Sequence, residues 1–142
     1  MHDDVGWHLA AAGSYERAAV PLGMYVAWLA NHHLLSETVV ERCATLVTRL
    51  RFREITGSEL VISGCAGLLD GSHLNAEGQA FTVQYYPGYL DDFRDVFGSD
   101  PYAVRDDWEH YDRLAPRLTR ALMRFRGQGE RRSRRPWWRL WK

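Results

Sequence analysis

The segment 20–35 is the feature that most constrains the fold. Its apolar residues, such as Leu22, Trp28 and Leu29, would cover most of the circumference of a helix. A helix that is apolar on all sides is stable in water only when other elements cover it. Pro21 suits a first helical turn, because its missing N–H needs no partner there. The sequence therefore predicts a central, largely buried helix over 20–35.

Further along the chain, apolar residues recur at spacings of three and four. Ser36 is the predicted N-cap of an amphipathic helix that reaches Leu50. Thr56 and Glu59 have the spacing of a capping box, which predicts a helix as far as Leu69. A β-strand over 59–63 is the alternative at that point.

Helices are also predicted over 76–86, over 89–97 and from Asp100 onward. The last of these should kink or break near Pro116, since proline removes an intrahelical hydrogen bond. Residues 1–19 are expected to form an ordered but irregular entry segment, with one turn of helix as an alternative within it, and no useful run alternates with period two. We therefore predict one compact all-α domain of about five or six helices.

Length and composition fit a single domain that needs no disulfide or bound metal for stability. A chain of 142 residues, 46% of them hydrophobic, can bury roughly two-thirds of its unfolded surface. Cys43 and Cys65 lack the spacing of a redox pair and are too few for a zinc site. The sequence contains neither a secretory signal pattern nor an apolar run long enough to span a membrane. We expect a cytoplasmic protein with no cofactor, no metal and no small-molecule substrate.

A net charge of zero hides an asymmetry along the chain. The 18 basic and 18 acidic residues are divided unevenly, because residues 127–142 contain six basic residues against Glu130. This segment therefore carries +5, and residues 1–126 carry −5. The predicted organisation is a helical domain over 1–126 followed by a basic, tryptophan-rich tail over 127–142.

Acidic residues are concentrated between positions 91 and 112. Paired carboxylates could serve acid–base or magnesium chemistry, but the sequence lacks a glycine-rich phosphate loop. An acidic face that attracts a basic protein is the favoured interpretation, with nearby aromatic residues as anchors. The predicted partner-binding residues are Tyr89, Asp91, Asp92, Asp95, Tyr102, Asp106, Asp107, Trp108, Glu109 and Asp112.

The tail interleaves arginine and tryptophan, which suits an anionic lipid surface or single-stranded nucleic acid. Docking onto the acidic helices of the same or a neighbouring molecule is a third interpretation, and an extension without a partner is the fourth. The predicted surface-binding residues of the tail are Arg131, Arg132, Arg134, Arg135, Trp137, Trp138, Arg139 and Trp141.

Two other kinds of chemistry were weighed against structural roles. Asp3, Asp4 and His8 are metal-ligand types that lie close together, which would suit a metal-dependent enzyme. The alternative is that the aspartates cap a first turn, that Trp7 anchors the segment in the core and that His8 bonds to the backbone. No serine lies in a nucleophile elbow, so a hydrolase is not indicated.

Several motifs together resemble a known family. They are DDVGWH at 3–8, LGMYVAW at 22–28, LNAEGQAF at 74–81 followed by YY at 85–86, YLDD at 89–92, DPYAV at 100–104 and WEHYDRL at 108–114. Over roughly residues 2–122 the chain resembles a family of small, uncharacterised, predominantly helical bacterial proteins. It departs from that family at 9–20 and in the tail.

The resemblance implies, by analogy, the immunity partners of polymorphic toxins. The predicted function is an immunity or antitoxin-type inhibitor that occludes a toxin with its acidic surface. The alternative is an adaptor that binds membrane or nucleic acid through the tail.

Overall fold

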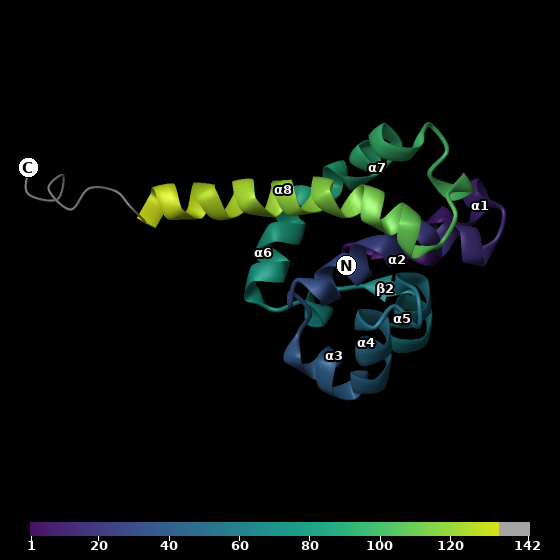
Figure 1. Cartoon of the computed structure of the whole chain (residues 1–142), viewed down its shortest axis with the longest axis horizontal. Coiled ribbons are helices and arrows are strands. Elements are labelled where there is room, and N and C mark those ends of the chain that lie inside the picture. The colour runs from purple at the N-terminus through teal and green to yellow at the C-terminus, as the bar shows by residue number, and fades with distance from the viewer. Residues whose placement is uncertain (134–142) are drawn as a thin grey trace, which may run out of the picture.

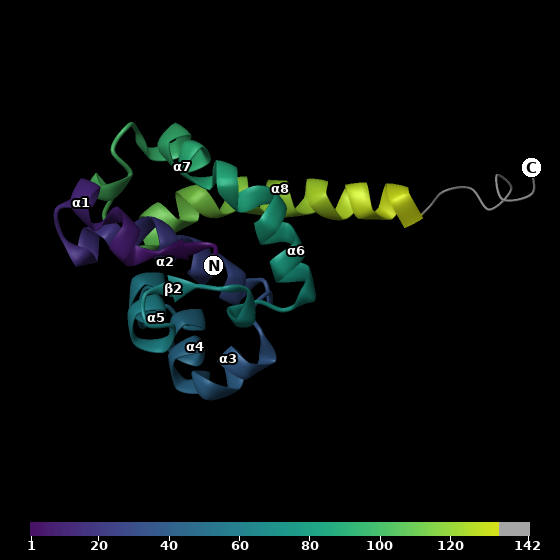
Figure 2. The same ribbon diagram turned by 180° about the vertical axis from the view of Figure 1, so that it is seen from behind.

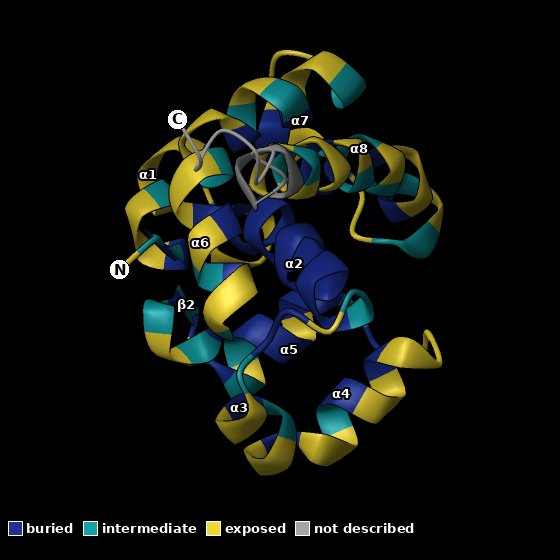
Figure 3. Cartoon of the chain, turned by 90° about the vertical axis from the view of Figure 1, so that its left-hand side faces the viewer, coloured by how far each residue is buried: buried dark blue, intermediate teal, exposed yellow. Residues whose placement is uncertain are grey.

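Helix α2, Tyr15–Asn31, runs through the middle of the molecule (Figure 1). The computed structural model describes residues 1–133, with side chains as far as Gly129. Every residue of α2 from Ala18 to Ala30 is buried, as the dark ribbon in Figure 3 shows. The prediction of a central buried helix is confirmed.

The predicted start of this helix is wrong. Ser14 begins α2 instead, because its side chain accepts a hydrogen bond from the backbone N–H of Arg17 at 3.2 Å. Glu16 adds a favourable negative charge in the first turn. Pro21 therefore lies inside the helix rather than in its first turn.

The segment before α2 is more regular than predicted. It contains β1, Asp3–Asp4, a 3-10 turn over Val5–His8 and α1, Leu9–Ala12. β1 pairs antiparallel with β2, Leu68–Leu69, in the register Asp3 opposite Leu69. A two-residue strand is too short to leave an alternating pattern in the sequence, so the pair escaped prediction.

Helix α5, Gly57–Gly64, packs directly on α2. A Cβ atom at Gly57 would lie 1.8 Å from the carbonyl oxygen of Gly23, so only glycine permits this approach. The alternative of a strand over 59–63 is wrong. The helix also ends before Leu69, because Ala66 and Gly67 adopt left-handed φ angles of 55° and 74° and turn the chain into β2.

Ser36 caps the helix that follows it, as predicted, whereas Thr56 does not. The side chain of Thr56 makes no capping bond to α5 and donates instead to Asp106 Oδ2 at 2.9 Å. The predicted helix over 36–50 is two helices, α3, Glu37–Arg42, and α4, Ala44–Arg51. They divide at Cys43, whose thiol donates to the Gly64 carbonyl at 3.5 Å. This contact with the end of α5 is long-range, so the local pattern could not reveal it.

The remaining helices are α6, Ala76–Tyr85, α7, Tyr89–Phe97, and α8, Trp108–Ser133. Asp100 caps only a 3-10 turn over Pro101–Ala103. Asp107 begins α8, because its carboxylate accepts from the N–H of His110 at 2.8 Å. The predicted helix from Asp100 is therefore a short turn and a separate long helix. α8 passes Pro116 without a break.

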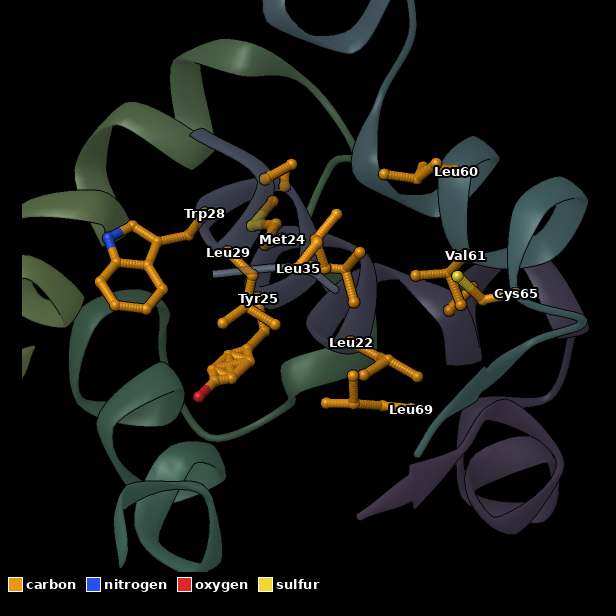
Figure 4. Packing of buried hydrophobic residues seen from close by; sticks show 14 of the residues in the cluster. Leu22, Met24, Tyr25, Trp28, Leu29, Leu35, Leu60, Val61, Cys65 and Leu69 are labelled. Atoms are coloured by element: carbon orange, nitrogen blue, oxygen red, sulfur yellow. The ribbon is translucent and has the colours of Figure 1, made fainter. Parts of the chain in front are cut away.

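Large side chains fill the space between α2 and the helices around it. Figure 4 shows Tyr25 and Trp28 pointing from α2 to one side and Leu22 toward Leu69 of β2. The Trp28 indole donates to Thr119 Oγ1 of α8 at 3.1 Å. The result is a mostly helical single domain, as predicted, although the described part of the chain contains more helices than expected.

Candidate functional site

The predicted acidic residues lie on α7, on the loop before α8 and on the first turns of α8. We call Asp91, Asp92, Asp95, Asp106, Asp107, Glu109 and Asp112 the acidic surface. Figure 2 shows α7 beside the N-terminal half of α8. Charge pairs with arginine hold several of these carboxylates in place, and each flank of α8 has its own pair.

On the α7 flank, Arg117 binds two carboxylates. Its guanidinium donates to Asp95 at 2.6 Å and to Asp92 at 2.9 Å. The Tyr85 hydroxyl donates to the second oxygen of Asp92 at 2.7 Å. Burial, together with that carboxylate, raises the pKa of Tyr85, so the phenol keeps the proton that it donates. Asp92 is therefore fixed from two sides.

On the opposite flank, Arg53 forms a two-bond pair with Asp112. The nitrogen–oxygen distances are 2.8 and 2.7 Å, and the guanidinium lies 4.8 Å from the ring centroid of Trp108. The hydrogen bonds from Arg53 lower the pKa of the Asp112 carboxyl. Arg53 itself has a φ of 60°, which L-residues seldom adopt. The residue that forms the ion pair with Asp112 therefore has a strained backbone.

The two pairs show that the acidic surface is not flat. Asp112 and Arg117 are five residues apart, which is about 140° around a helix axis. The carboxylates therefore wrap around the first half of α8, and the exposed Glu109 lies between the flanks. Asp91 is also highly exposed, at 89% of its side-chain area.

The acidic surface keeps a net negative charge after its internal pairs are counted. The segment 91–112 contains eight carboxylates, including Asp100. Five arginines lie in or beside it, so three negative charges remain. Those five arginines are Arg53, Arg94, Arg105, Arg113 and Arg117.

A groove lies beside the acidic surface, between α2, α5 and the loop before α8. Its volume is about 430 Å³. Desolvation raises the pKa of Asp106 at its edge, although part of that side chain remains exposed. We call it the acidic groove, lined by Glu16, Arg17, Val20, Thr56, Ser58, Glu59, Ile62, Val104 and Asp106.

A much smaller cavity adjoins the acidic groove, since Thr56 and Asp106 line both. Its volume of about 10 Å³ leaves room for roughly one water molecule. Trp108 also lines it, and its buried indole Nε1 has no hydrogen-bond partner in the described part of the chain.

Two of the residues proposed as metal ligands, Asp3 and His8, form a chain of hydrogen bonds with two tyrosines instead. Asp3 Oδ1 lies 2.6 Å from His8 Nε2, and His8 Nδ1 lies 2.6 Å from the Tyr102 hydroxyl. The Tyr86 hydroxyl donates to the other oxygen of Asp3. We call Asp3, His8, Tyr86 and Tyr102 the Asp3 network.

Asp4 takes no part in the Asp3 network. Its carboxylate caps the first 3-10 turn by accepting from Gly6 N at 2.7 Å. Within residues 1–133, no three His, Cys, Asp or Glu side chains are arranged to hold a metal ion. The interpretation that the aspartates cap the first turn is confirmed for Asp4 and wrong for Asp3, and Trp7, which is 63% exposed, does not anchor the segment in the core. The interpretation that His8 bonds to the backbone is wrong, because its ring contacts two side chains.

Two of the predicted aromatic anchors lie in the interior. Tyr89 has no exposed area, and its hydroxyl donates to the Pro21 carbonyl at 2.6 Å. Tyr102 is 9% exposed and belongs to the Asp3 network. Neither can anchor a partner in this structure. Trp108 stays partly exposed at the edge of the acidic surface.

The roles of Tyr86 and Tyr102 in the Asp3 network could not be predicted from the sequence. Tyr86 is separated from Asp3 by 83 residues, and Tyr102 from His8 by 94 residues. Periodicity carries no information over such separations. The available signal was the resemblance itself, because its motifs contain Asp3, His8, Tyr86 and Tyr102.

Helix α8 extends past the predicted start of the tail. It continues through Gly127 and Gly129 to Ser133 and projects beyond α6 (Figure 1). Arg131 and Arg132 lie in its last turn. No helix among the described residues is long and apolar enough to cross a membrane. The other predicted tail residues lie outside the described part of the chain: Arg134, Arg135, Trp137, Trp138, Arg139 and Trp141.

Comparison with known proteins yields one family. Residues 1–105 match the profile of a domain of unknown function, DUF7832. The matched range contains the Asp3 network, α2 and α7, and it ends shortly before α8. No curated protein and no solved structure matches the chain.

Proposed function

We propose that the chain, which belongs to the DUF7832 family of domains of unknown function, is a binding protein whose partner is a basic protein. The observation that supports this is the acidic surface, whose carboxylates remain in excess over the arginines around them. Electrostatic complementarity of this kind speeds association with a basic partner and rejects acidic ones.

The finer proposal is an immunity or antitoxin-type inhibitor. It would act by covering the active site of a basic toxin domain with the acidic surface. The arginine pairs support this role, because Arg53 and Arg117 fix Asp112, Asp92 and Asp95 before a partner arrives. Side chains that are already ordered lose less entropy on binding, which favours affinity.

Charge reversal at two exposed positions tests the proposal. Asp91→Lys with Glu109→Lys changes carboxylates that cap no helix and accept no hydrogen bond from Arg53 or Arg117. We expect the full-length wild type to capture one stoichiometric basic protein from the native cell, and the double variant to lose it. A double variant that keeps the same partner at wild-type affinity would contradict this role for the acidic surface.

A second candidate function uses the tail. The projection of α8 as far as Ser133 favours it, because the helix carries the end of the chain away from the body. In this proposal the chain is an adaptor that binds anionic lipid or nucleic acid through arginine and tryptophan. Trp137→Ala, Trp138→Ala and Trp141→Ala together should then abolish recovery of lipid or nucleic acid, whereas the Asp91→Lys, Glu109→Lys variant should retain it.

A further inference from the structure

The acidic groove and the tail are complementary in charge and in apolar character. We propose that the basic, tryptophan-rich tail of one molecule binds in the acidic groove of a second copy of the chain. The proposal does not depend on the function of the acidic surface, since Glu16 and Val20 lie on α2, and Glu59 and Ile62 lie on α5.

The groove combines an apolar wall with a charged rim. Val20, Ile62 and Val104 supply aliphatic surface. Glu16, Glu59 and Asp106 supply three carboxylates against the single cation of Arg17. Arginine has an aliphatic stem that packs on apolar surface and a guanidinium that binds carboxylates in paired hydrogen bonds. Indole rings favour the same mixed surroundings.

The tail has matching chemistry. Residues 127–142 carry +5, and the rest of the chain carries −5. Four basic residues and three tryptophans lie beyond Ser133. A volume of about 430 Å³ is that of a small ligand site, so the groove can take part of the tail rather than all of it.

The geometry of α8 makes this contact intermolecular. From Trp108 to Ser133 the helix axis rises about 37 Å, at about 1.5 Å per residue. Residues 134–142, even fully extended at about 3.5 Å each, span about 31 Å. The groove lies beyond the Trp108 end of the helix, because Asp106 and Val104 line it. The tail therefore cannot reach the groove of its own molecule while α8 remains helical.

Sedimentation velocity of the full-length protein over a wide concentration range tests the proposal. At low salt we expect the mass to rise with concentration, either to a closed dimer or to longer head-to-tail assemblies. At about 1 M salt, where screening acts within about 3 Å, we expect a monomer. A synthetic peptide of residues 131–142, added in excess, should also dissociate the assembly, because it competes for the groove.

Matched variants locate the contact. Trp137→Ala, Trp138→Ala and Trp141→Ala together should abolish self-association, whereas Trp7→Ala, which removes an indole that is 63% exposed on the body, should not. Glu59→Lys in the groove should weaken self-association by about tenfold, while Glu41→Lys beside a different pocket should leave it unchanged.

A compensating exchange supplies the most specific check. Glu59→Arg combined with Arg134→Glu and Arg135→Glu should restore the self-association that either change alone removes. Circular dichroism of each variant identifies any that fails to fold, and Asp106→Asn then replaces Glu59→Lys as the groove variant.

Two results would overturn the proposal. One is a monomer at every concentration, including a monomer whose tryptophans bind vesicles of anionic phospholipid or single-stranded nucleic acid instead. The other is self-association that survives both Glu59→Lys and Asp106→Asn. The Asp91→Lys, Glu109→Lys variant should self-associate like the wild type, so loss of the basic partner and loss of self-association remain distinguishable.

Discussion

The Asp3 network and the acidic surface both contain aspartates, but those aspartates differ in burial and in their hydrogen-bond partners. In the network, the Asp3 side chain is 8% exposed, and each of its oxygens accepts a hydrogen bond from His8 or Tyr86. On the acidic surface, Asp91 is 89% exposed and has only a distant arginine, at 3.7 Å. A buried polar group without its partner costs far more than an exposed one. The network should therefore govern stability, and the acidic surface should govern binding.

Removing the centre of the Asp3 network should have the largest effect on stability. Asp3→Ala leaves His8 and Tyr86 without their acceptor, and we expect it to lower the free energy of unfolding by about 3 kcal/mol. Chemical denaturation measures this. Asp4→Ala, which removes only an exposed cap, is the matched control and should cost about 1 kcal/mol. Equal losses of unfolding free energy in the two variants would contradict the claim that the Asp3 network governs stability.

An intermediate effect is expected where the acidic surface meets the core. Arg117→Ala unpairs Asp92 and Asp95, and we expect a loss of about 1 kcal/mol, because the guanidinium and Asp92 are only partly exposed. Arg120→Ala, one turn further on the exposed side of α8, should change stability by less than about 0.5 kcal/mol. If thermal unfolding shifts equally in both variants, Arg117 stabilises the fold through charge alone rather than through its two specific bonds.

A smaller effect separates backbone strain from the ion pair at Arg53. Arg53→Ala and Arg53→Gly both remove the pair with Asp112, but only glycine adopts a φ of 60° without strain. We expect the glycine variant to be more stable than the alanine variant by about 1 kcal/mol in urea denaturation. The opposite order would mean that the left-handed backbone at this position costs nothing.

The smallest effect is a dependence of stability on pH. Burial, with Arg126 and His33 nearby, lowers the pKa of His32, whose ring lies 4.7 Å from that of Trp28. The unfolded chain therefore binds a proton at a higher pH than the fold does. Stability from this group is complete above about pH 6.5 and declines as the pH falls toward the folded pKa. His32→Gln should flatten the unfolding free energy over that interval, whereas an unchanged slope would assign the decline to other groups.

The local pattern predicted helices well wherever a helix follows its own periodicity. The burial of α2 and the existence of α6 and α7 could be predicted from the local sequence alone. Prediction failed where a contact between residues far apart in the sequence determines where a helix begins. Thr56 lies at a position typical of a capping residue, but its hydroxyl donates a hydrogen bond to Asp106 instead. Asp100 and Pro101 have the sequence of a helix start, yet α8 begins at Asp107.

The candidate site was predicted in composition but not in arrangement. The sequence shows how many carboxylates lie between 91 and 112, and the structure shows which arginines hold them. It also removes Tyr89 and Tyr102 from the surface, because helical spacing alone cannot tell a core tyrosine from an exposed one. Asp3 and His8 look like metal ligands in sequence because their hydroxyl partners lie far along the chain.

One paired measurement tests the account most directly: partner capture and thermal unfolding on the same two full-length variants. Asp91→Lys with Glu109→Lys should lose the basic partner and unfold only slightly below the wild-type temperature, because each change places a cation in the first turn of a helix. Tyr86→Phe, which removes one hydroxyl from the Asp3 network, should keep the partner and unfold at a lower temperature. If the surface variant keeps its partner while Tyr86→Phe loses it at unchanged stability, the functional site is the Asp3 network and the division of roles proposed for the two regions is wrong.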